Sequence, residues 1–188
     1  WSSDVCSSDL GSAPITFTTS TLLIGSMVSC NLLVDSGNNQ ARPVDTVLPD
    51  PLVVTMAPCK PGTLVTFTIK SGGGTVTPIA TPVSSQCKAS TTYRLGAKSG
   101  PASITASSAI TGTAQFDLTA LPGPPTKILP FSGNQQTGPV GRDLPAPIVI
   151  RVLDAYENPT PRIEVEFEVR SEEHTSELQS HLNLVCRL

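Results

Sequence analysis

Short stretches in which apolar and polar residues alternate with a period of two run through residues 11–169. The clearest are LVTFTIK (64–70) and IEVEFEV (163–169), where valine, phenylalanine and isoleucine fall on one face and threonine, lysine or glutamate on the other. Glycine, proline, serine and asparagine separate these stretches, and no stretch of ten residues has the 3.6-residue apolar period of a helix. This pattern predicts an all-β sandwich.

The interior of the chain also repeats itself. One match, at an offset of 96 residues, joins SGNNQARPVDTVLPDPLVV (36–54) to SGNQQTGPVGRDLPAPIVI (132–150), and another, at an offset of 101, joins GSAPITFTT (11–19) to GTAQFDLTA (112–120). Self-similarity at a fixed spacing is typical of tandem units. We therefore expect a fragment truncated at both ends, made of the last strand of an upstream repeat (11–19), a connector (20–31), a complete domain (32–120), a proline-rich linker (121–127) and the first half of a second domain (128–169).

The two ends look like translated sequencing adapter. Read back into codons, WSSDVCSSD at the start and RSEEHTSELQS and LVCRL at the end match a common short-read library adapter in its two orientations. We therefore expect residues 1–10 and 170–188 to be adapter-derived and set them apart from fold reasoning. An amphipathic helix over 171–185 is the structural alternative, and a zinc site at His174 and His181 would lack the four-residue spacing of a helical pair.

Charge and composition exclude several classes of protein. The ends hold two of the 12 basic and five of the 15 acidic residues, so residues 11–169 hold ten of each and are neutral, without histidine or tryptophan. A neutral segment lacks the basic patch of a nucleic-acid-binding protein. Its apolar runs of four or five residues are far shorter than the roughly 18–20 that a membrane span needs. We expect no nucleic-acid partner and no membrane contact by this fragment.

The order of several motifs resembles a known family. The chain contains VTFTIKSGGGTV, ASTTYRLG, FDLTALPGPP and SGNQQTGPVGRDLPAPIVIRVLDAYENPTP in this order. The order and spacing of these motifs resemble the bacterial immunoglobulin-like repeats of group 1, which occur in invasin- and intimin-type surface proteins. The resemblance implies a seven-strand Greek-key immunoglobulin-like β-sandwich, with neighbouring repeats of the same chain as partners. The chain departs from the family pattern at Glu157, where glycine is usual, and in the complete unit Cys59 and Lys60 replace that turn. At Tyr93 the family has an aromatic residue that is often tryptophan.

Placed on that template, the alternation predicts the strands of the complete unit and their inward residues. We expect strands near 32–36 and at 51–56, 64–70, 74–78, 89–95, 102–107 and 114–119. The expected core consists of Leu52, Val54, Met56, Val65, Phe67, Ile69, Val76, Tyr93, Leu95, Ile104, Phe116 and Leu118. Burying each such side chain contributes about 1.5–3 kcal/mol, enough for a unit of about 90 residues to fold. In 128–169, half of the inner face would have no partner.

The interior cysteines favour a disulfide over a metal site. They stand at 30, 59 and 87 with no Cys-x-x-Cys pair, which disfavours zinc. On the template, Cys59 lies in the loop after the second strand and Cys87 just before the fifth, and both loops open at the same end. We expect a Cys59–Cys87 disulfide, which implies an oxidising compartment. Cys30 is left over, either to pair outside the fragment or to stay free.

The residue patterns give little support to catalysis. Nucleophilic catalysis of the Ser-His-Asp or Cys-His type needs a base, and residues 11–169 contain no histidine. Glu164, Glu166 and Glu168 alternate onto the solvent face of one predicted strand. Residues 71–74 (SGGG) lack the Gly-Lys-Ser/Thr ending of a phosphate loop and predict a turn. We therefore expect no catalytic residue and no cofactor.

One loop contains residues that could bind a metal ion. Asp154, Glu157 and Asn158 offer oxygen ligands that suit calcium. Asp and Asn also stabilise turns by bonding to their own backbone, and this second interpretation is the one we adopt, so no metal is expected.

Two functions fit these features. The first is a non-catalytic immunoglobulin-like repeat of a large secreted or cell-surface bacterial protein, acting as a stalk or spacer in adhesion, with a host or cell-surface protein or a polysaccharide as a further partner. The alternative is an accessory spacer or carbohydrate-contacting module of an extracellular polysaccharide-degrading enzyme. Sugar stacking needs exposed aromatic residues, and Tyr156 and Phe131 are the candidates, which disfavours this alternative.

Overall fold

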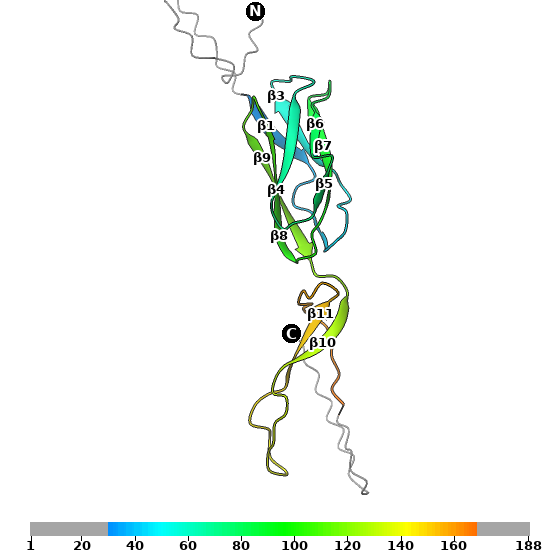
Figure 1. Cartoon of the computed structure of the whole chain (residues 1–188), viewed down its shortest axis with the longest axis vertical. Helices are drawn as coiled ribbons and strands as arrows, with labels where there is room; N and C mark the ends of the chain where they lie inside the picture. The colour runs from blue at the N-terminus through cyan, green and yellow to red at the C-terminus, as the bar shows by residue number, and fades with distance from the viewer. Residues whose placement is uncertain (1–29, 169–188) are drawn as a thin grey trace, which may run out of the picture. The chain divides into compact units, whose positions relative to one another are not determined.

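The computed structural model describes residues 30–168, which are built from β-strands, turns and loops. The adapter-like ends, the strand expected at 11–19 and nearly all of the connector expected at 20–31 lie outside the described residues. The chain divides into two compact units after Leu121, and we call their described parts unit 1 (30–121) and unit 2 (122–168) (Figure 1). Within 30–168 no helix has the length and apolar character that a bilayer span requires.

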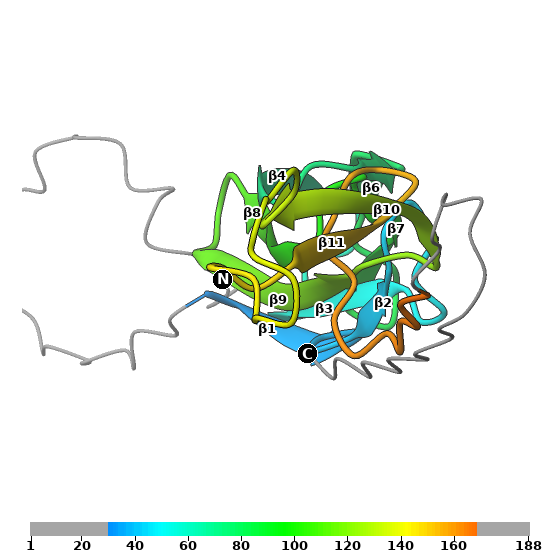
Figure 2. The ribbon, with the colours of Figure 1, turned by 90° about the horizontal axis from the view of Figure 1, so that it is seen from below.

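Unit 1 is a sandwich of two β-sheets. The first sheet has the order β1-β3-β7-β5, from β1 (Asn31–Ser36), β3 (Leu52–Ala57), β7 (Lys88–Arg94) and β5 (Thr75–Thr77). The second has the order β2-β9-β8-β4-β6, from β2 (Ala41–Pro43), β9 (Thr113–Leu121), β8 (Gly100–Ser108), β4 (Leu64–Ser71) and β6 (Ala80–Pro82). Figure 2 shows β4 and β8 on one side of unit 1 and β1 and β3 on the other. This strand order is that of a Greek-key immunoglobulin sandwich, which confirms the predicted fold class.

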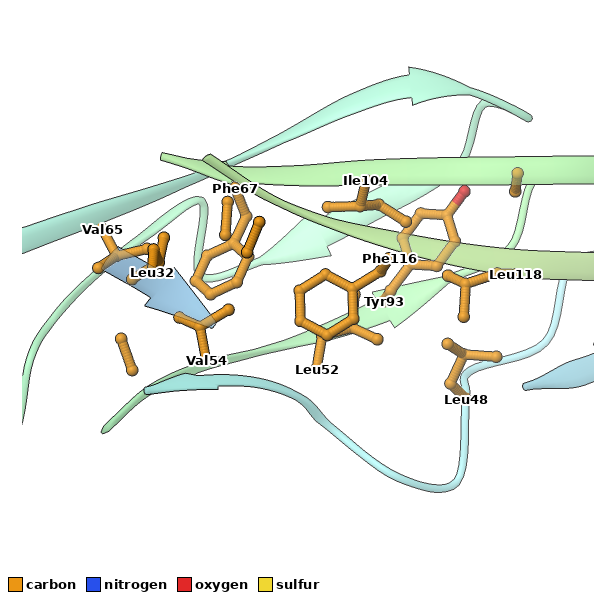
Figure 3. Packing of buried hydrophobic residues seen from close by; sticks show 14 of the residues in the cluster. Leu32, Leu48, Leu52, Val54, Val65, Phe67, Tyr93, Ile104, Phe116 and Leu118 are labelled. Atoms are coloured by element: carbon orange, nitrogen blue, oxygen red, sulfur yellow. The ribbon is translucent and has the colours of Figure 1, made fainter. Parts of the chain in front are cut away.

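Side chains from both sheets meet in one hydrophobic core (Figure 3). The alternation that predicted the strands also selects their inward residues: in β9 the side chains of Ala114, Phe116, Leu118 and Ala120 are buried and those between them are exposed. All twelve predicted core residues belong to this cluster, ten of them buried and Ile69 and Val76 partly buried. The period-two pattern therefore identified the centre of the core correctly.

Two short strands of unit 1 were not predicted. The seven expected strands each appear within two residues of their predicted bounds, whereas β2 and β6 have three residues each and include proline. Three residues are too few for an alternating pattern to show. β2 pairs parallel with β9, and the residues that follow it, Val44 and Leu48, enter the core although the sequence did not mark them.

Unit 2 contains two paired strands, β10 (Pro125–Ser132) and β11 (Val149–Asp154). Because β9 ends at Leu121 and β10 begins at Pro125, the connector outside strands is Pro122–Pro124, shorter than the linker expected over 121–127. Proline lacks a backbone donor, but at the first position of a strand this costs little. The strand can therefore begin inside the proline-rich segment.

The pairing of β10 with β11 reproduces the pairing of β1 with β3 at the offset of 96 residues. Leu32 faces Met56 in unit 1, and Ile128 faces Val152 in unit 2. Both ladders also shift register just before the serine of the shared SGN motif. The repeat in the sequence is thus a repeat of the same strand pair.

The strand expected over IEVEFEV is absent from the described residues. Residues 161–168 form no strand, although Ile163, Val165 and Phe167 are half-buried and the glutamates between them exposed, as predicted. Val169 lies outside the described residues. In unit 1 the counterpart β4 takes its hydrogen-bond partners from β8 and β6, and the described part of unit 2 has no such strands. Without a neighbour, the backbone groups of this segment have no ladder to join.

Candidate functional site

The turn after β11 is built around the buried side chain of Asp154. Its Oδ1 accepts hydrogen bonds from the backbone amides of Tyr156 and Asn158, both at 2.8 Å. Its Oδ2 accepts from Nδ2 of Asn158 at 2.9 Å and from the backbone amide of Gly123 at 2.8 Å. One carboxylate therefore holds the turn together and ties it to the connector at the start of unit 2.

The electrostatics of this turn favour an ionised aspartate. Burial raises the pKa of Asp154, but hydrogen bonds from Asn158 and from the amides of Gly123 and Tyr156 outweigh that effect and hold the pKa below its usual range. A charged acceptor makes these bonds stronger than bonds between neutral groups.

The same contacts disfavour calcium in this turn. A calcium site needs oxygen lone pairs that face a shared space, whereas two N–H donors already occupy each oxygen of Asp154. Within 30–168 no group of three or more His, Cys, Asp and Glu side chains is placed to hold a metal ion. We interpret the arrangement as a structural turn.

Glu157 occupies a position in this turn that suits glycine. Its φ of 66° lies in the left-handed region, where glycine has no steric cost. This explains why the bacterial immunoglobulin-like repeats that the chain resembles usually have glycine there. The Glu157 carboxylate lies 3.6 Å from Nζ of Lys127, and such an exposed ion pair contributes little to stability.

A disulfide fixes the equivalent turn of unit 1. At the offset of 96 residues Pro58 stands in the place of Asp154. The next residue, Cys59, is bonded to Cys87 with the two Cα atoms 5.0 Å apart, which is the pairing expected from the sequence. Cys30 is also disulfide-bonded.

A glutamine shared by the two units has a role that the sequence analysis missed. Nε2 of Gln40 donates to the carbonyls of Gly37 and Asp50 at 2.7 and 2.9 Å, and its Oε1 accepts from the Asp50 amide at 3.1 Å. In unit 2 Gln136 makes the same three bonds, at 2.7, 2.7 and 2.8 Å, to the residues 96 positions later. We call each set the glutamine staple. The identity of this glutamine in both copies was the signal that could have revealed it.

The SGGG segment forms the expected turn, between β4 and β5. Gly72, Gly73 and Gly74 all have positive φ, and a Cβ on Gly74 would collide with the carbonyl of Arg94. The buried Tyr93 hydroxyl donates to the carbonyl of Gly73, and burial raises the pKa of this tyrosine. A hollow of about 580 Å³ beside the turn is lined by glycines, Ala97, Lys98, Ser99 and Pro101. This lining offers no pair of groups for acid–base chemistry.

The two aromatic candidates lie in different surroundings in unit 2. Phe131 is 61% exposed, and the guanidinium of Arg151 lies 4.3 Å from its ring centroid. Tyr156 is 45% exposed and lies in the Asp154 turn. A ring covered on one face by a guanidinium offers a sugar one remaining face, which disfavours the carbohydrate-contacting alternative further.

Comparison with known proteins adds likenesses of fold. No protein-family model and no curated protein sequence matches this chain. Among solved structures, the D00–D0 domains of intimin share 17% identity at a TM-score of 0.38, over 48% of this chain and 46% of that chain. The D0–D1 domains of intimin share 16% identity at a TM-score of 0.38, over 71% and 69%.

A third likeness is to domains 4–9 of the surface layer protein SbsC, with 16% identity and a TM-score of 0.37, over 76% of this chain and 23% of that chain. The chain therefore spans less than half of the first of these structures and less than a quarter of the third. At such identities and scores the likenesses carry no argument about function. The fold assignment rests on the strand order of unit 1.

Proposed function

We propose that this segment is a non-catalytic immunoglobulin-like repeat of a large secreted or cell-surface bacterial protein, in which consecutive repeats act as a spacer in adhesion. The observation that carries the proposal is the structural repeat. β10 and β11 copy the register of β1 and β3, together with the glutamine staple, after a connector of three residues, Pro122–Pro124. Building the same element twice with so short a connection is typical of a tandem array.

The connector supports a semi-rigid junction. Pro122 and Pro124 fix their own φ angles and favour an extended path. Between them, Gly123 donates its amide to the buried carboxylate of Asp154. Each of the three connector residues is thus restrained, by its ring or by a charge-assisted hydrogen bond.

The chemistry of the described surface supports a role other than catalysis. The glutamates of 164–168 point to solvent, and the Asp154 carboxylate is occupied by hydrogen-bond donors. The Cys59–Cys87 disulfide supports an extracellular location, because such bonds persist in oxidising compartments. Neighbouring repeats are the proposed partners in the chain, and a host or cell-surface protein or a polysaccharide is the proposed outside partner.

Small-angle scattering on proteins of one, two and three complete units, made by repeating residues 32–127, tests the spacer. We expect the maximum dimension to grow nearly in proportion to the number of units. A matched set in which a flexible Gly-Ser connector replaces residues 122–124 should be more compact. If the proteins with the original connector stayed compact, so that their maximum dimension grew much less than the number of units, the spacer proposal would be contradicted. Turnover of a substrate by residues 11–169 would contradict the proposal that the segment is non-catalytic.

A further inference from the structure

The sequence contains a single Asp-Pro pair, Asp50–Pro51, and it lies in an exposed part of unit 1. The pair follows β2 and directly precedes the first residue of β3. A peptide bond to proline is a tertiary amide, and its nitrogen is a better leaving group in acid than that of an ordinary peptide bond. The aspartate before it carries a carboxyl group that can attack this bond from within the same residue.

The carboxylate of Asp50 is not engaged in the structure. The other aspartates of unit 1, Asp35, Asp45 and Asp117, each accept a hydrogen bond from a neighbouring side chain. In residues 30–168 no hydrogen bond or ion pair holds the side chain of Asp50. This carboxyl group can therefore turn toward its own backbone carbonyl, and its exposure gives water access to the product.

The glutamine staple acts on the same carbonyl. Nε2 of Gln40 donates to the Asp50 carbonyl oxygen at 2.9 Å, while Oε1 accepts from the Asp50 amide at 3.1 Å. A further bond to the Gly37 carbonyl, at 2.7 Å, fixes the orientation of the glutamine amide. Negative charge develops on a carbonyl oxygen when its carbon is attacked, and a donor that is already in place stabilises this charge. The staple therefore polarises the carbonyl at which the chain would break.

We propose that Asp50–Pro51 is a self-cleavage site, at which the protonated Asp50 carboxyl attacks its own backbone carbonyl in mild acid. A bond forms between a carboxyl oxygen and the carbonyl carbon, and the bond from that carbon to the Pro51 nitrogen breaks. The carboxyl proton passes to the nitrogen, so that Pro51 becomes the amino terminus of the second fragment. Water then opens the cyclic anhydride of Asp50 to two carboxyl groups, and the net reaction is hydrolysis.

Cleavage at this bond would interrupt the chain inside an intact sandwich. β1 and β2 would belong to the first fragment, and β3 and β9 to the second. The antiparallel pairing of β1 with β3 and the parallel pairing of β2 with β9 would still join the fragments. In a spacer, the function proposed above, the nick would leave hydrogen-bonded ladders in place of one covalent link.

Unit 2 provides a matched control within the same chain. Gln136 makes the same three bonds there, two of them to Ala146, and Pro147 follows. The bond between Ala146 and Pro147 thus has the proline and the glutamine donor but no carboxyl group. We expect this bond to stay intact, and Ala146→Asp should introduce a second cleavage site at it.

Mass spectrometry of the full chain tests the proposal after incubation at about pH 4, where carboxyl groups begin to take up protons. Amide exchange of β3 and β9 shows whether unit 1 is folded under these conditions. The chain is reduced just before the measurement, so that no disulfide holds the fragments together. We expect fragments 1–50 and 51–188, formed about threefold faster or more than the fragments of the peptide VLPDPLVV (47–54), because the peptide lacks the staple.

Three variants separate the parts of the site. Asp50→Ala should abolish the fragments, which removes the attacking group and leaves the proline. Gln40→Met keeps the length of the side chain but loses the donor, and it should slow cleavage about tenfold, less than in an enclosed active site, since water can replace the donor. Gln136→Met is the matched control and should leave the rate unchanged.

Three outcomes would overturn the proposal: fragments that persist in Asp50→Ala, a folded chain that cleaves no faster than the peptide, or an unchanged rate in Gln40→Met. The second outcome would leave only the acid sensitivity that any Asp-Pro bond has. The scattering test of the spacer is made at neutral pH, so its result and the result of this experiment are independent.

Discussion

The turns after β3 and β11 occupy the same place in the two units and are fixed in different ways. In unit 1 the Cys59–Cys87 disulfide ties the turn to a residue 28 positions later in the same sandwich. In unit 2 the Asp154 carboxylate ties the turn to Gly123 in the preceding connector. The covalent link therefore restrains the sandwich that contains it, whereas the hydrogen-bonded link restrains the first residues of unit 2. Two repeats can therefore share the same strands while the turn after the second strand is held by different contacts.

The two units also differ in what surrounds an otherwise identical strand pair. β1 with β3 and β10 with β11 share their register and their glutamine staple. In unit 1 the second sheet, β2-β9-β8-β4-β6, covers the inner face of this pair. In the described part of unit 2 no second sheet is present, and on this face Ile148 is 53% exposed although Val152 is buried. The strand pair therefore forms in both units, whereas its inner face is fully buried in unit 1, where the second sheet covers it.

The disulfide should show the largest difference between the two turns. Replacing Cys59 and Cys87 together with alanine should destabilise unit 1 by about 3–4 kcal/mol, because the denatured chain regains the freedom of a loop spanning 28 residues. Amide hydrogen exchange of β3 and β7 would measure the loss, with β10 and β11 as the internal reference. Cys30→Ser, which leaves the Cys59–Cys87 bond in place, is the matched control for a cysteine substitution. Equal acceleration of exchange in both units would contradict the expectation that the loss of stability is confined to unit 1.

Removing the glutamine staple should have an effect of intermediate size, and the effect should differ between the two units. Gln40→Ala should cost unit 1 about 0.5–1.5 kcal/mol, because the amide and carbonyl of Asp50 and the carbonyl of Gly37 lose their partner and are left to water. Gln136→Ala removes the same bonds in unit 2 but should raise exchange in the loop 133–146 alone. Denaturant unfolding followed by exchange at β9 distinguishes the two. A global loss of stability from Gln136→Ala would contradict the prediction.

The Asp154 turn should give the smallest and most local effect, seen best as a dependence on pH. The folded pKa of Asp154 is lowered, so its contribution is present above the usual aspartate pKa and is lost as the pH falls through the folded value. Exchange at Gly123 and Asn158, corrected for intrinsic rates, should therefore increase on acidification. The turn of unit 1, which has Pro58 at this place, provides the comparison.

Variants of Asp154 sharpen the same measurement. Asp154→Ala should accelerate exchange at Gly123 on the order of tenfold at neutral pH, because a half-buried donor loses its charged acceptor. Asp154→Asn keeps the size of the side chain but loses the charge and one acceptor oxygen. It should show no acid transition in this turn. An acid transition that persists in Asp154→Asn would assign the pH dependence to another group.

Much of unit 1 could be predicted from the sequence, because its information is local. Alternation gave Phe67, Ile104 and Phe116 as inward residues, and the repeat gave the equivalence of the two strand pairs. The short strands β2 and β6 were beyond such reasoning, since three residues carry no period. The strand over IEVEFEV was predicted and is not formed in residues 161–168, because a strand also needs a neighbour.

The sequence by itself determined which side chains point the same way, which segments repeat and that SGGG (71–74) forms a turn. Side-chain direction and the turn depend on residues a few positions apart, where backbone geometry converts spacing into direction, and the repeat is visible by comparing the two segments directly. The tertiary structure decided whether Val44 or its copy Val140 is buried and whether Asp154 binds a cation or backbone amides. Those outcomes depend on partners distant in the chain. The Val44 amide donates to the carbonyl of Leu121 at the end of β9, which holds Val44 beside the core, and Gly123 stands 31 residues before the carboxylate that accepts its amide.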